Sequence, residues 1–319
     1  MVRNRFRFAA LAIAVLLCIL AVGLRAQSKA TKAADGEDVT ILVTVDPHNE
    51  RERARATALK PGDFGVREDG RPQKILSVRR ALETPTTVAV LIQDDLVSRV
   101  DLEIRGIADF IRGLPEGSRV MTGYLTVGDL NVAQEFTTDR ERAAKSLRIV
   151  RSTRSAAPYN PYVGLIAALR RFDSQPEGRR MVLMISDGLD LSHGFSSASP
   201  TLSIDLDRAI GVAQREGVSV FAFYAPSVGL GFIRRLEINF GQGSLNRLAD
   251  ETGGEAFFSG TDFVSFHSYW QELKDIFNLQ WVITYRSSSQ GSGFRRIEVT
   301  TEPGLHVQHP RGYRARSDA

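Results

Sequence analysis

Three aspartates stand directly after apolar runs that have the composition of buried strands. Asp94 and Asp95 follow residues 88–93 (VAVLIQ), and Asp187 follows residues 181–186 (MVLMIS). In a doubly wound sheet the carboxyl ends of the central strands meet at one edge, so we expect the three carboxylates to converge there. Uncompensated carboxylates repel one another, which predicts a divalent cation or a hydrogen-bonded network. Mg²⁺, a hard cation that prefers oxygen ligands, suits such a site.

A plainer interpretation of these aspartates needs no metal. Asp94 would cap the helix that follows it by accepting backbone N–H bonds, and Asp187 would cap a loop in the same way. We interpret Asp95 as a solvated carboxylate in the first turn of that helix and not as a ligand. Both interpretations keep Asp94 and Asp187 as the candidate site residues.

Alternating strand and helix patterns from residue 87 onward would position these side chains. The strand at 88–93 precedes a helix whose apolar residues recur at helical spacing: Val100, Ile104, Ile107, Ile111 and Leu114. Further strands are expected at 118–127, 131–136, 181–186 and 218–225, and further helices at 164–172, 203–217, 244–252 and 265–277. This alternation predicts an α/β fold, a doubly wound, mostly parallel sheet with helices on both faces.

Both flanks of this α/β domain, which we place at residues 85–278, have strand signals. We expect residues 39–84 to form a small β-rich element. Within it, residues 47–56 (PHNERERARA) are so charged that we expect an exposed loop or a frayed turn. Residues 279–316 carry two strand signals around a Gly/Ser-rich stretch, which predicts a C-terminal β hairpin packing with the N-terminal element.

The N-terminus has the pattern of an export signal. Residues 1–26 combine a basic start, an apolar run shorter than a bilayer span and a small residue at Ala26, which predicts a signal peptide, and residues 27–38 a flexible lead-in. An uncleaved membrane anchor is the alternative, and either would export the rest of the chain to the periplasm or beyond. Cys18 is the only cysteine and lies in this leader, so the mature chain has no thiol or disulfide chemistry.

The charge balance argues against nucleic acid as a partner. Four of the 41 basic residues lie in the leader, which has no acidic residue, so the remaining basic residues equal the 37 acidic ones in number. The basicity is therefore a targeting feature, and the mature chain is near neutrality. We expect a protein or a cell-envelope ligand as the partner.

At the candidate site the chain resembles the von Willebrand factor A family. The metal-ion-dependent adhesion site of that family has the pattern Asp-x-Ser-x-Ser after the first strand, a Thr in a second loop and an Asp after a later strand. Residues 94–98 (DDLVS) match the first Asp and the second Ser, with Leu96 in place of the first Ser, and Ser186-Asp187-Gly188 matches the last element. Asn160 is the candidate for the place of the Thr. The resemblance implies an incomplete Mg²⁺ site with the ligands Asp94, Ser98, Asn160 and Asp187.

The resemblance extends to the flanks of the domain. Residues 63–75 and 285–315 are similar to segments that flank this domain in exported von Willebrand factor A-related proteins common in acidobacteria. With these flanks, the resemblance covers residues 39–316.

Three functions compete for the edge of the sheet above Asp94 and Asp187. The resemblance implies a non-enzymatic binding module of adhesion type, for which the long polar loop at 189–203 would supply recognition. The alternative is a Mg²⁺-dependent phosphoryl-transfer enzyme at the same acidic edge, although the chain has no Gly-rich phosphate loop and no lysine directly after the 218–225 strand. The third is a metal-free structural domain of the envelope.

Histidines and tryptophans are interpreted as structural. His306 and His309 have no carboxylate or cysteine partner nearby in the sequence, so they are taken as surface residues and not as zinc ligands. His193 is taken as a loop residue, and Trp270 and Trp281 as packing residues.

Overall fold

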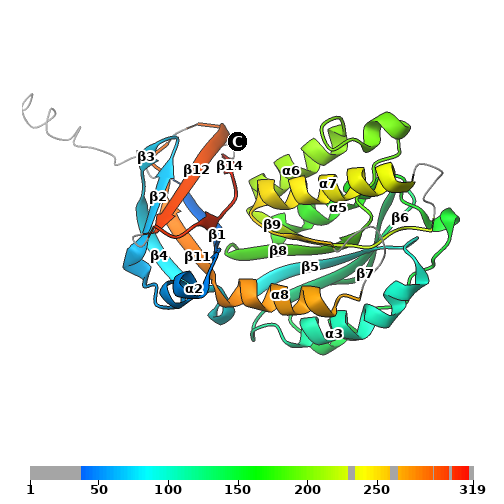
Figure 1. Cartoon of the computed structure of the whole chain (residues 1–319), viewed down its shortest axis with the longest axis horizontal. Coiled ribbons are helices and arrows are strands. Elements are labelled where there is room, and N and C mark those ends of the chain that lie inside the picture. The colour runs from blue at the N-terminus through cyan, green and yellow to red at the C-terminus, as the bar shows by residue number, and fades with distance from the viewer. Residues whose placement is uncertain (1–36, 229–233, 259–264, 290, 302–303, 316–319) are drawn as a thin grey trace, which may run out of the picture. The chain divides into compact units, whose positions relative to one another are not determined.

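Six strands form the central sheet in the spatial order β10-β9-β8-β5-β6-β7. The computed structural model describes residues 37–228, 234–258, 265–289, 291–301 and 304–315. The strands are β5 (Thr86–Gln93), β6 (Arg119–Thr126), β7 (Asp129–Thr137), β8 (Arg179–Ser186), β9 (Val218–Tyr224) and β10 (Ala256–Phe257). Neighbours pair in parallel except for β7, which is antiparallel to β6 at the edge. The α/β class predicted from the sequence is confirmed (Figure 1).

Helices cover both faces of this sheet. They are α3 (Ile104–Arg112), α4 (Arg140–Lys145), α5 (Pro161–Leu169), α6 (Ile204–Glu216), α7 (Arg234–Thr252) and α8 (His267–Asn278). In Figure 1, α5, α6 and α7 lie on one face, and α3 and α8 lie on the other. Because side chains alternate along a strand, Val90 and Ile92 of β5 join the core on the α3 and α8 side, and Leu91 joins the core under α5 to α7.

The local sequence explains where the helices begin and end. The hydroxyl of Ser203 accepts a bond from the Leu206 N–H at the start of α6. The same helix ends at Gly217, whose φ of 62° is the left-handed conformation that glycine adopts at low cost, as the sequence predicts.

Two further sheets contain the strands from both ends of the described chain. The first has the order β13-β1-β11-β4 and the second the order β14-β12-β2-β3. The strands are β1 (Asp38–Val45), β2 (Phe64–Glu68), β3 (Arg71–Pro72), β4 (Lys74–Arg80), β11 (Gln280–Arg286), β12 (Gly293–Thr301), β13 (Val307–Gln308) and β14 (Gly312–Ala315). Apolar side chains of both sheets share one core cluster, which includes Val43, Val66, Trp281 and Ile297. We call these two sheets the β unit.

Two expectations for these flanks are wrong. The C-terminal strands β11 and β12 do not form a hairpin, because β11 pairs with β1 and β4 while β12 pairs with β2 and β14. The charged segment expected as a loop contains a helix, α2 (Glu50–Thr57), because the Asn49 side chain caps it and Ala56 supplies a buried contact.

Short 3-10 helices complete the described elements. They are η1 (Pro61–Asp63), η2 (Ala81–Glu83), η3 (Ser98–Glu103), η4 (Arg154–Ala156), η5 (Arg170–Ser174) and η6 (Phe195–Ala198). None of the helices within the described ranges is long and apolar enough to cross a membrane. The predicted signal peptide and Cys18 lie outside those ranges.

Candidate functional site

Asp94 lies at the carboxyl end of β5, where its carboxylate is completely buried and paired with arginine. Arg148 donates from both terminal nitrogens, with Nη1 2.7 Å from Oδ1 and Nη2 2.9 Å from Oδ2. Arg151 adds its backbone N–H at 3.1 Å from Oδ1 and its Nε at 3.2 Å from Oδ2. A bidentate guanidinium is a strong partner for a buried carboxylate, so these two arginines compensate the charge of Asp94.

The arginine that pairs with Asp94 is itself held in place. Its guanidinium lies over the ring of Tyr124, 3.7 Å from the ring centre. The Tyr124 hydroxyl donates to the Arg148 carbonyl oxygen at 2.7 Å and accepts from its N–H at 2.6 Å. The hydrogen bond to Asp94 is the main cause that raises the pKa of the Arg148 side chain. The charged pair is therefore held in place by the segment that follows α4.

The next carboxylate, Asp95, points toward β8 and not toward the arginines. The side-chain amide of Gln93 donates to Asp95 Oδ1 at 2.8 Å. The oxygen of the same amide accepts from the Ser186 hydroxyl at 2.5 Å and from the Asp187 backbone N–H at 3.2 Å. Gln93 thus links the ends of β5 and β8. The interpretation of Asp95 as a solvated residue is wrong, since it is only 2% exposed.

The pair Asp95 and Asp187 forms a buried acidic centre. Burial is the largest cause raising the pKa of Asp95 to about 7, and the charge of Asp187 is the next. Burial also raises the pKa of Asp187, while its bond from the Leu189 N–H, at 3.0 Å, opposes the shift. Two facing carboxylates of this kind do not both ionise readily near neutral pH, so we expect the pair to retain a proton there.

The remaining predicted ligands lie elsewhere in the contact network. Ser98 is exposed at the start of η3. Asn160 caps α5, since its side-chain oxygen accepts from the Tyr162 N–H at 3.0 Å and its amide donates to Asp205 at 2.8 Å. Among the described residues, the aspartates after β5 and β8 do not form a group of three carboxylates within metal-binding reach of one another.

Leu96, which stands where the family pattern has a Ser, belongs to the core. Its side chain is completely buried in the cluster under α3 and α8. Its backbone forms an isolated antiparallel bridge with Ser227, and the Val97 N–H donates to the Pro226 carbonyl at 3.0 Å. The loop after β5 is therefore fixed by packing and by the loop after β9.

The loop after β8 is organised around a buried carboxylate. Asp190 accepts from the Ser192 hydroxyl at 2.6 Å and from the Ser203 hydroxyl at 2.7 Å, so it joins both ends of the loop. Beside it, Leu202 and Ile204 line a hollow of 180 Å³ and are 63% and 72% exposed. We call residues 94–98, 187–203 and 225–228 the rim.

Tyr159 adds a third exposed apolar side chain next to the rim. Its φ of 54° is unusual for a residue other than glycine, and its carbonyl accepts from the Leu191 N–H at 2.6 Å. Its side chain is 57% exposed. Asn160, the next residue after Tyr159, donates to Asp205, the next residue after Ile204, so the two segments lie side by side. We call Tyr159, Leu202 and Ile204 the apolar patch.

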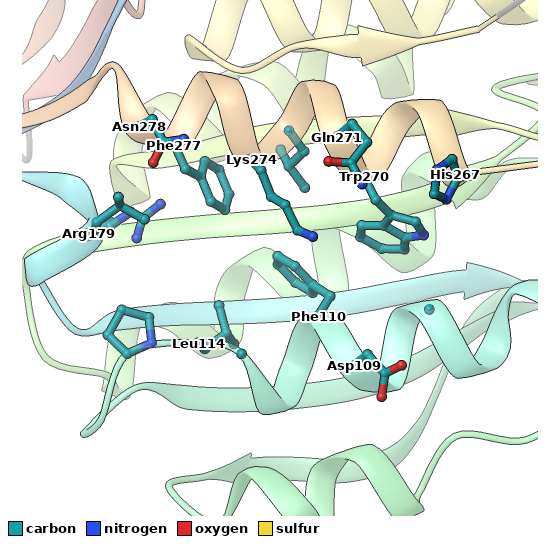
Figure 2. Close-up of a pocket in the computed structure, with 15 residues that line it drawn as sticks. Asp109, Phe110, Leu114, Arg179, His267, Trp270, Gln271, Lys274, Phe277 and Asn278 are labelled. Carbon is teal, nitrogen blue, oxygen red and sulfur yellow. The ribbon is translucent and has the colours of Figure 1, made fainter. Parts of the chain in front are cut away.

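A second hollow lies between α3 and α8, on the other face of the sheet. Phe110, Trp270 and Phe277 are among the residues that line this cavity of 510 Å³, and Figure 2 shows Phe110 of α3 facing α8 across it. Arg179 stands at one end, buried, with its guanidinium over the Phe277 ring and a bond to the Ala81 carbonyl oxygen at 2.9 Å. Burial lowers its pKa to about 10. The aromatic rings pack Trp270 into the core as the sequence predicts.

Solved structures with a similar backbone include two bacterial proteins and a human coat protein. An aerotolerance-related membrane protein from Bacteroides fragilis is 15% identical, and the match covers 61% of this chain and 99% of that chain at a TM-score of 0.41. The protein BatB from Bacteroides thetaiotaomicron is 14% identical, with 60% and 96% covered and a TM-score of 0.40. Human Sec24c is 8% identical, with 73% and 44% covered and a TM-score of 0.41. Such distant likenesses assign no function to this chain. No protein-family model and no curated protein matches it.

Gln93 and Arg148 were not identified from the sequence, and Asp95 was given the wrong role. The period of two along a strand is the signal that connects Gln93 with Asp95, because it places these two residues on one side and Asp94 on the other. No pattern in the sequence near Asp94 predicts its pairing with Arg148, which lies 54 residues away in the chain.

Proposed function

We propose that this protein is an exported, non-enzymatic binding module of von Willebrand factor A type that engages a protein or cell-envelope ligand through its rim. The apolar patch is the observation that carries the proposal. Large apolar side chains exposed together beside the carboxyl ends of the strands are typical of interaction sites, and Tyr is enriched among the residues that dominate binding energy. The signal pattern in residues 1–26 supports export.

Rigid support for the patch strengthens this proposal. Asp190 and Ser203 close the loop that carries Leu202, and Asn160 joins the loop of Tyr159 to the first turn of α6. A patch that is ordered before binding costs less conformational entropy when a partner arrives. The backbone of Tyr159, held at positive φ, fits the same interpretation, because such strain is concentrated at functional sites.

The Mg²⁺ site implied by the resemblance does not fit the four residues as they stand. Asp94 already accepts four donors from two arginines, and Asn160 uses its oxygen to cap α5. We therefore propose that binding at the rim proceeds without a metal. Titration of Mg²⁺ and Mn²⁺ by calorimetry tests this, with Asp94→Ala and Asp187→Ala as variants. Saturable binding that both variants abolish would restore the metal site and contradict the metal-free proposal.

The phosphoryl-transfer alternative is disfavoured by the same contacts. A nucleophilic aspartate must reach substrate, whereas Asp94 is completely buried under guanidinium groups. Asp95 and Asp187 are 2% and 4% exposed. Turnover of a phosphate ester in the presence of Mg²⁺, abolished by Asp94→Ala, would revive the enzyme.

The binding proposal is tested by sedimentation with cell envelopes of the producing organism. A double variant, Leu202→Ser with Ile204→Ser, removes most of the patch without touching a buried residue. A matched control, Leu82→Ser with Phe294→Ser, changes two exposed apolar residues away from the rim, which are 49% and 45% exposed. We expect the patch variant to weaken binding by about tenfold or more, since two apolar contacts of roughly 1 kcal/mol each are lost. Equal binding by both double variants would rule out the patch.

A further inference from the structure

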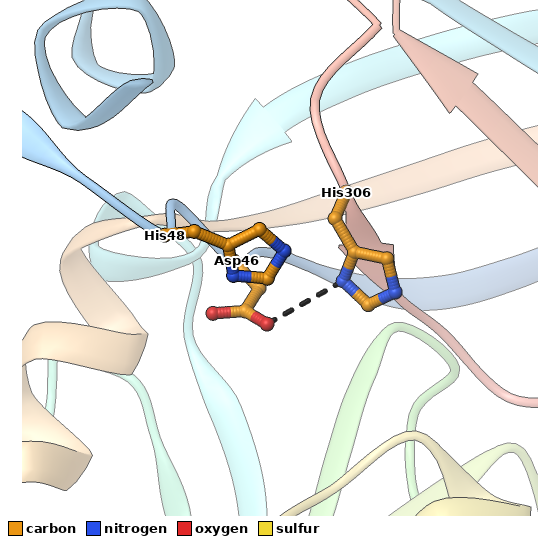
Figure 3. Close-up of side chains that lie close together, drawn as sticks. All are labelled: Asp46, His48 and His306. Carbon is orange, nitrogen blue, oxygen red and sulfur yellow. Dashed lines mark ion pairs between the residues drawn. The ribbon is translucent and has the colours of Figure 1, made fainter. Parts of the chain in front are cut away.

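Three potential metal ligands meet in the β unit, and none of them belongs to the rim. Asp46, His48 and His306 each offer a ligand atom, and these atoms all lie within 4.8 Å of one another. His306 Nδ1 is 3.4 Å from Asp46 Oδ2, and the two imidazole rings have centres 5.7 Å apart. Figure 3 shows the carboxylate of Asp46 and the two rings gathered at one point. The sequence interpretation of His306 as a surface residue without partners missed this, because its partners lie near the other end of the chain.

The backbone fixes both segments that carry these side chains. The Asp46 N–H donates to the His306 carbonyl oxygen at 3.0 Å, and this bond continues the pairing of β1 with β13. The His48 N–H donates to Glu52 at 2.9 Å, within the capped start of α2. Only side-chain torsions therefore need to change for the three ligand atoms to approach one ion.

The other histidine of the same segment is occupied by the backbone. His309 Nδ1 is 2.9 Å from the Pro310 carbonyl oxygen, and its Nε2 accepts from the Val299 N–H at 3.4 Å. His306 and His48 are both exposed, so an ion can reach them from solvent. The charge of Asp46 is among the causes that raise the pKa of Glu255, after burial, so a second carboxylate lies near the cluster. An acidic neighbourhood attracts cations.

The donor set selects the kind of ion. Two imidazole nitrogens and one carboxylate oxygen suit Zn²⁺ and the neighbouring transition metals, whereas Mg²⁺ and Ca²⁺ prefer oxygen alone. In a tetrahedral zinc site with bonds of about 2.0–2.1 Å, ligand atoms stand roughly 3.4 Å apart. Exposed side chains that already lie within 4.8 Å reach that separation by small torsional changes.

We propose that Asp46, His48 and His306 bind one Zn²⁺ ion, with water in the fourth position. The ion would join the end of β1 and the start of α2 to the segment before β13, and so would fasten the two chain ends of the β unit. The role is structural: metal binding to the folded chain raises its melting temperature by mass action. This site is independent of the rim and of the binding function proposed for it.

The test is a calorimetric titration of ZnCl₂ into the purified, chelator-treated chain. His48→Ala and His306→Ala each remove one ligand, and Asp46→Asn removes the carboxylate while keeping its shape. His267→Ala is the matched control, since His267 is exposed on α8 and outside the cluster. Melting curves with and without Zn²⁺ provide a second readout that also reports whether each variant folds.

We expect one ion per chain, an affinity at least about tenfold weaker in each ligand variant, and little change in His267→Ala. Zn²⁺ should raise the melting temperature of the wild type and of the control but not of the ligand variants. No saturable binding by the wild type would overturn the site. An affinity equal to that of the wild type in His48→Ala and His306→Ala would overturn it as well, because the ion would then bind elsewhere.

Discussion

The two consecutive aspartates after β5 have different partners: Asp94 pairs with two arginines, and Asp95 accepts from Gln93. The pairing of Asp94 is the easier one to test. Arg148 supplies the bidentate contact to buried Asp94, whereas the Arg151 side chain is 59% exposed and its backbone bond survives substitution. We expect Arg148→Ala to lower the free energy of unfolding by about 2–4 kcal/mol, because it leaves a buried charge poorly compensated. Arg151→Ala should cost less than about 1 kcal/mol. Urea denaturation of both variants decides this, and equal losses would contradict the assignment of Arg148 as the main partner.

The other aspartate makes stability depend on pH. The pKa of Asp95 is about 7 in the folded chain against an ordinary value of 3.8, so the folded state binds more protons between those values. The contribution of this group therefore falls as pH rises from about 4 to about 7. Asp95→Asn keeps an oxygen that can accept from Gln93 and removes the charge. We expect the variant to match the wild type near pH 4 and to exceed it by about 2–4 kcal/mol at pH 8.

Urea denaturation at the two pH values measures that difference directly. Subtracting the wild type from the variant cancels the titration of every other group that the substitution leaves alone. A variant that is less stable than the wild type at pH 8 would show that Asp95 is held as a favourable anion and that the proposed shared proton is absent.

These residues also show what a sequence can reveal about a site. Apolar runs followed by carboxylates correctly indicated the strand ends that carry Asp94 and Asp187. The partners of those carboxylates could not be predicted from the sequence. Arg148 and Tyr124 belong to a different loop and strand, and only the folded structure brings them next to Asp94. The ligand set borrowed from the family pattern assigned Asn160 to a metal, while its local role as an N-cap was readable from the proline after it.

Among the elements, the close approach of α7 to the loop after β8 depends on a glycine, which has no side chain at the contact. A methyl group at Gly241 would overlap the Asp187 carbonyl oxygen, whereas one at Gly243 would stand 3.0 Å from a Pro200 side-chain carbon. Both glycines lie within α7, so alanine gains similar helix propensity at either position. We expect Gly241→Ala to lower the free energy of unfolding by about 1–3 kcal/mol through overpacking, and Gly243→Ala to change it by less than about 1 kcal/mol.

Thermal denaturation of the two variants compares them on the same helix. Similar melting temperatures would show that the loop carrying Asp187 can move away from α7 at no cost, and that the acidic centre is less rigid than its contacts indicate.

Elements with a strong local hydrophobic pattern were predictable, and elements that depend on distant partners were not. The strands β5, β8 and β9 are buried at every position and appeared as continuous apolar runs. The helix α2 was not predicted, because the high charge of the segment indicates a loop. Its capping signal, Asn49 followed by Glu52, indicates the start of a helix. The pairing of β11 and β12 was misassigned because a Gly/Ser-rich connection resembles a hairpin turn even when its two strands enter different sheets.

For the whole molecule, the two ends of the described chain meet in the β unit around a buried carboxylate. Glu68 of β2 is completely buried and accepts from the hydroxyls of Tyr285 and Tyr313 at 3.1 Å and of Ser287 at 2.8 Å. Tyr313 belongs to β14, so the last strand completes the hydrogen bonding of one of the first. A fold closed in this way requires the C-terminal segment for the stability of the N-terminal one.

Shortening the chain tests that dependence, and the two tryptophans allow it to be observed locally. Trp281 lies in β11 of the β unit and Trp270 lies in α8, so a Trp270→Phe background makes fluorescence report on the β unit alone. Deleting residues 302–319 removes the buried side chains Leu305 and Tyr313, which should cost at least about 3–5 kcal/mol. Tyr313→Phe removes only the hydroxyl and should cost about 1–2 kcal/mol.

We expect the truncated chain to lose Trp281 fluorescence at a lower urea concentration than it loses far-ultraviolet circular dichroism, which is dominated by the helices around the central sheet. The order of the effects, with Tyr313→Phe between the wild type and the truncation, would tie the loss to the contacts of Glu68 and its neighbours. Coincident transitions at an unchanged midpoint would mean that the last strands contribute nothing to the β unit. The closure of the chain ends would then be incidental to its stability.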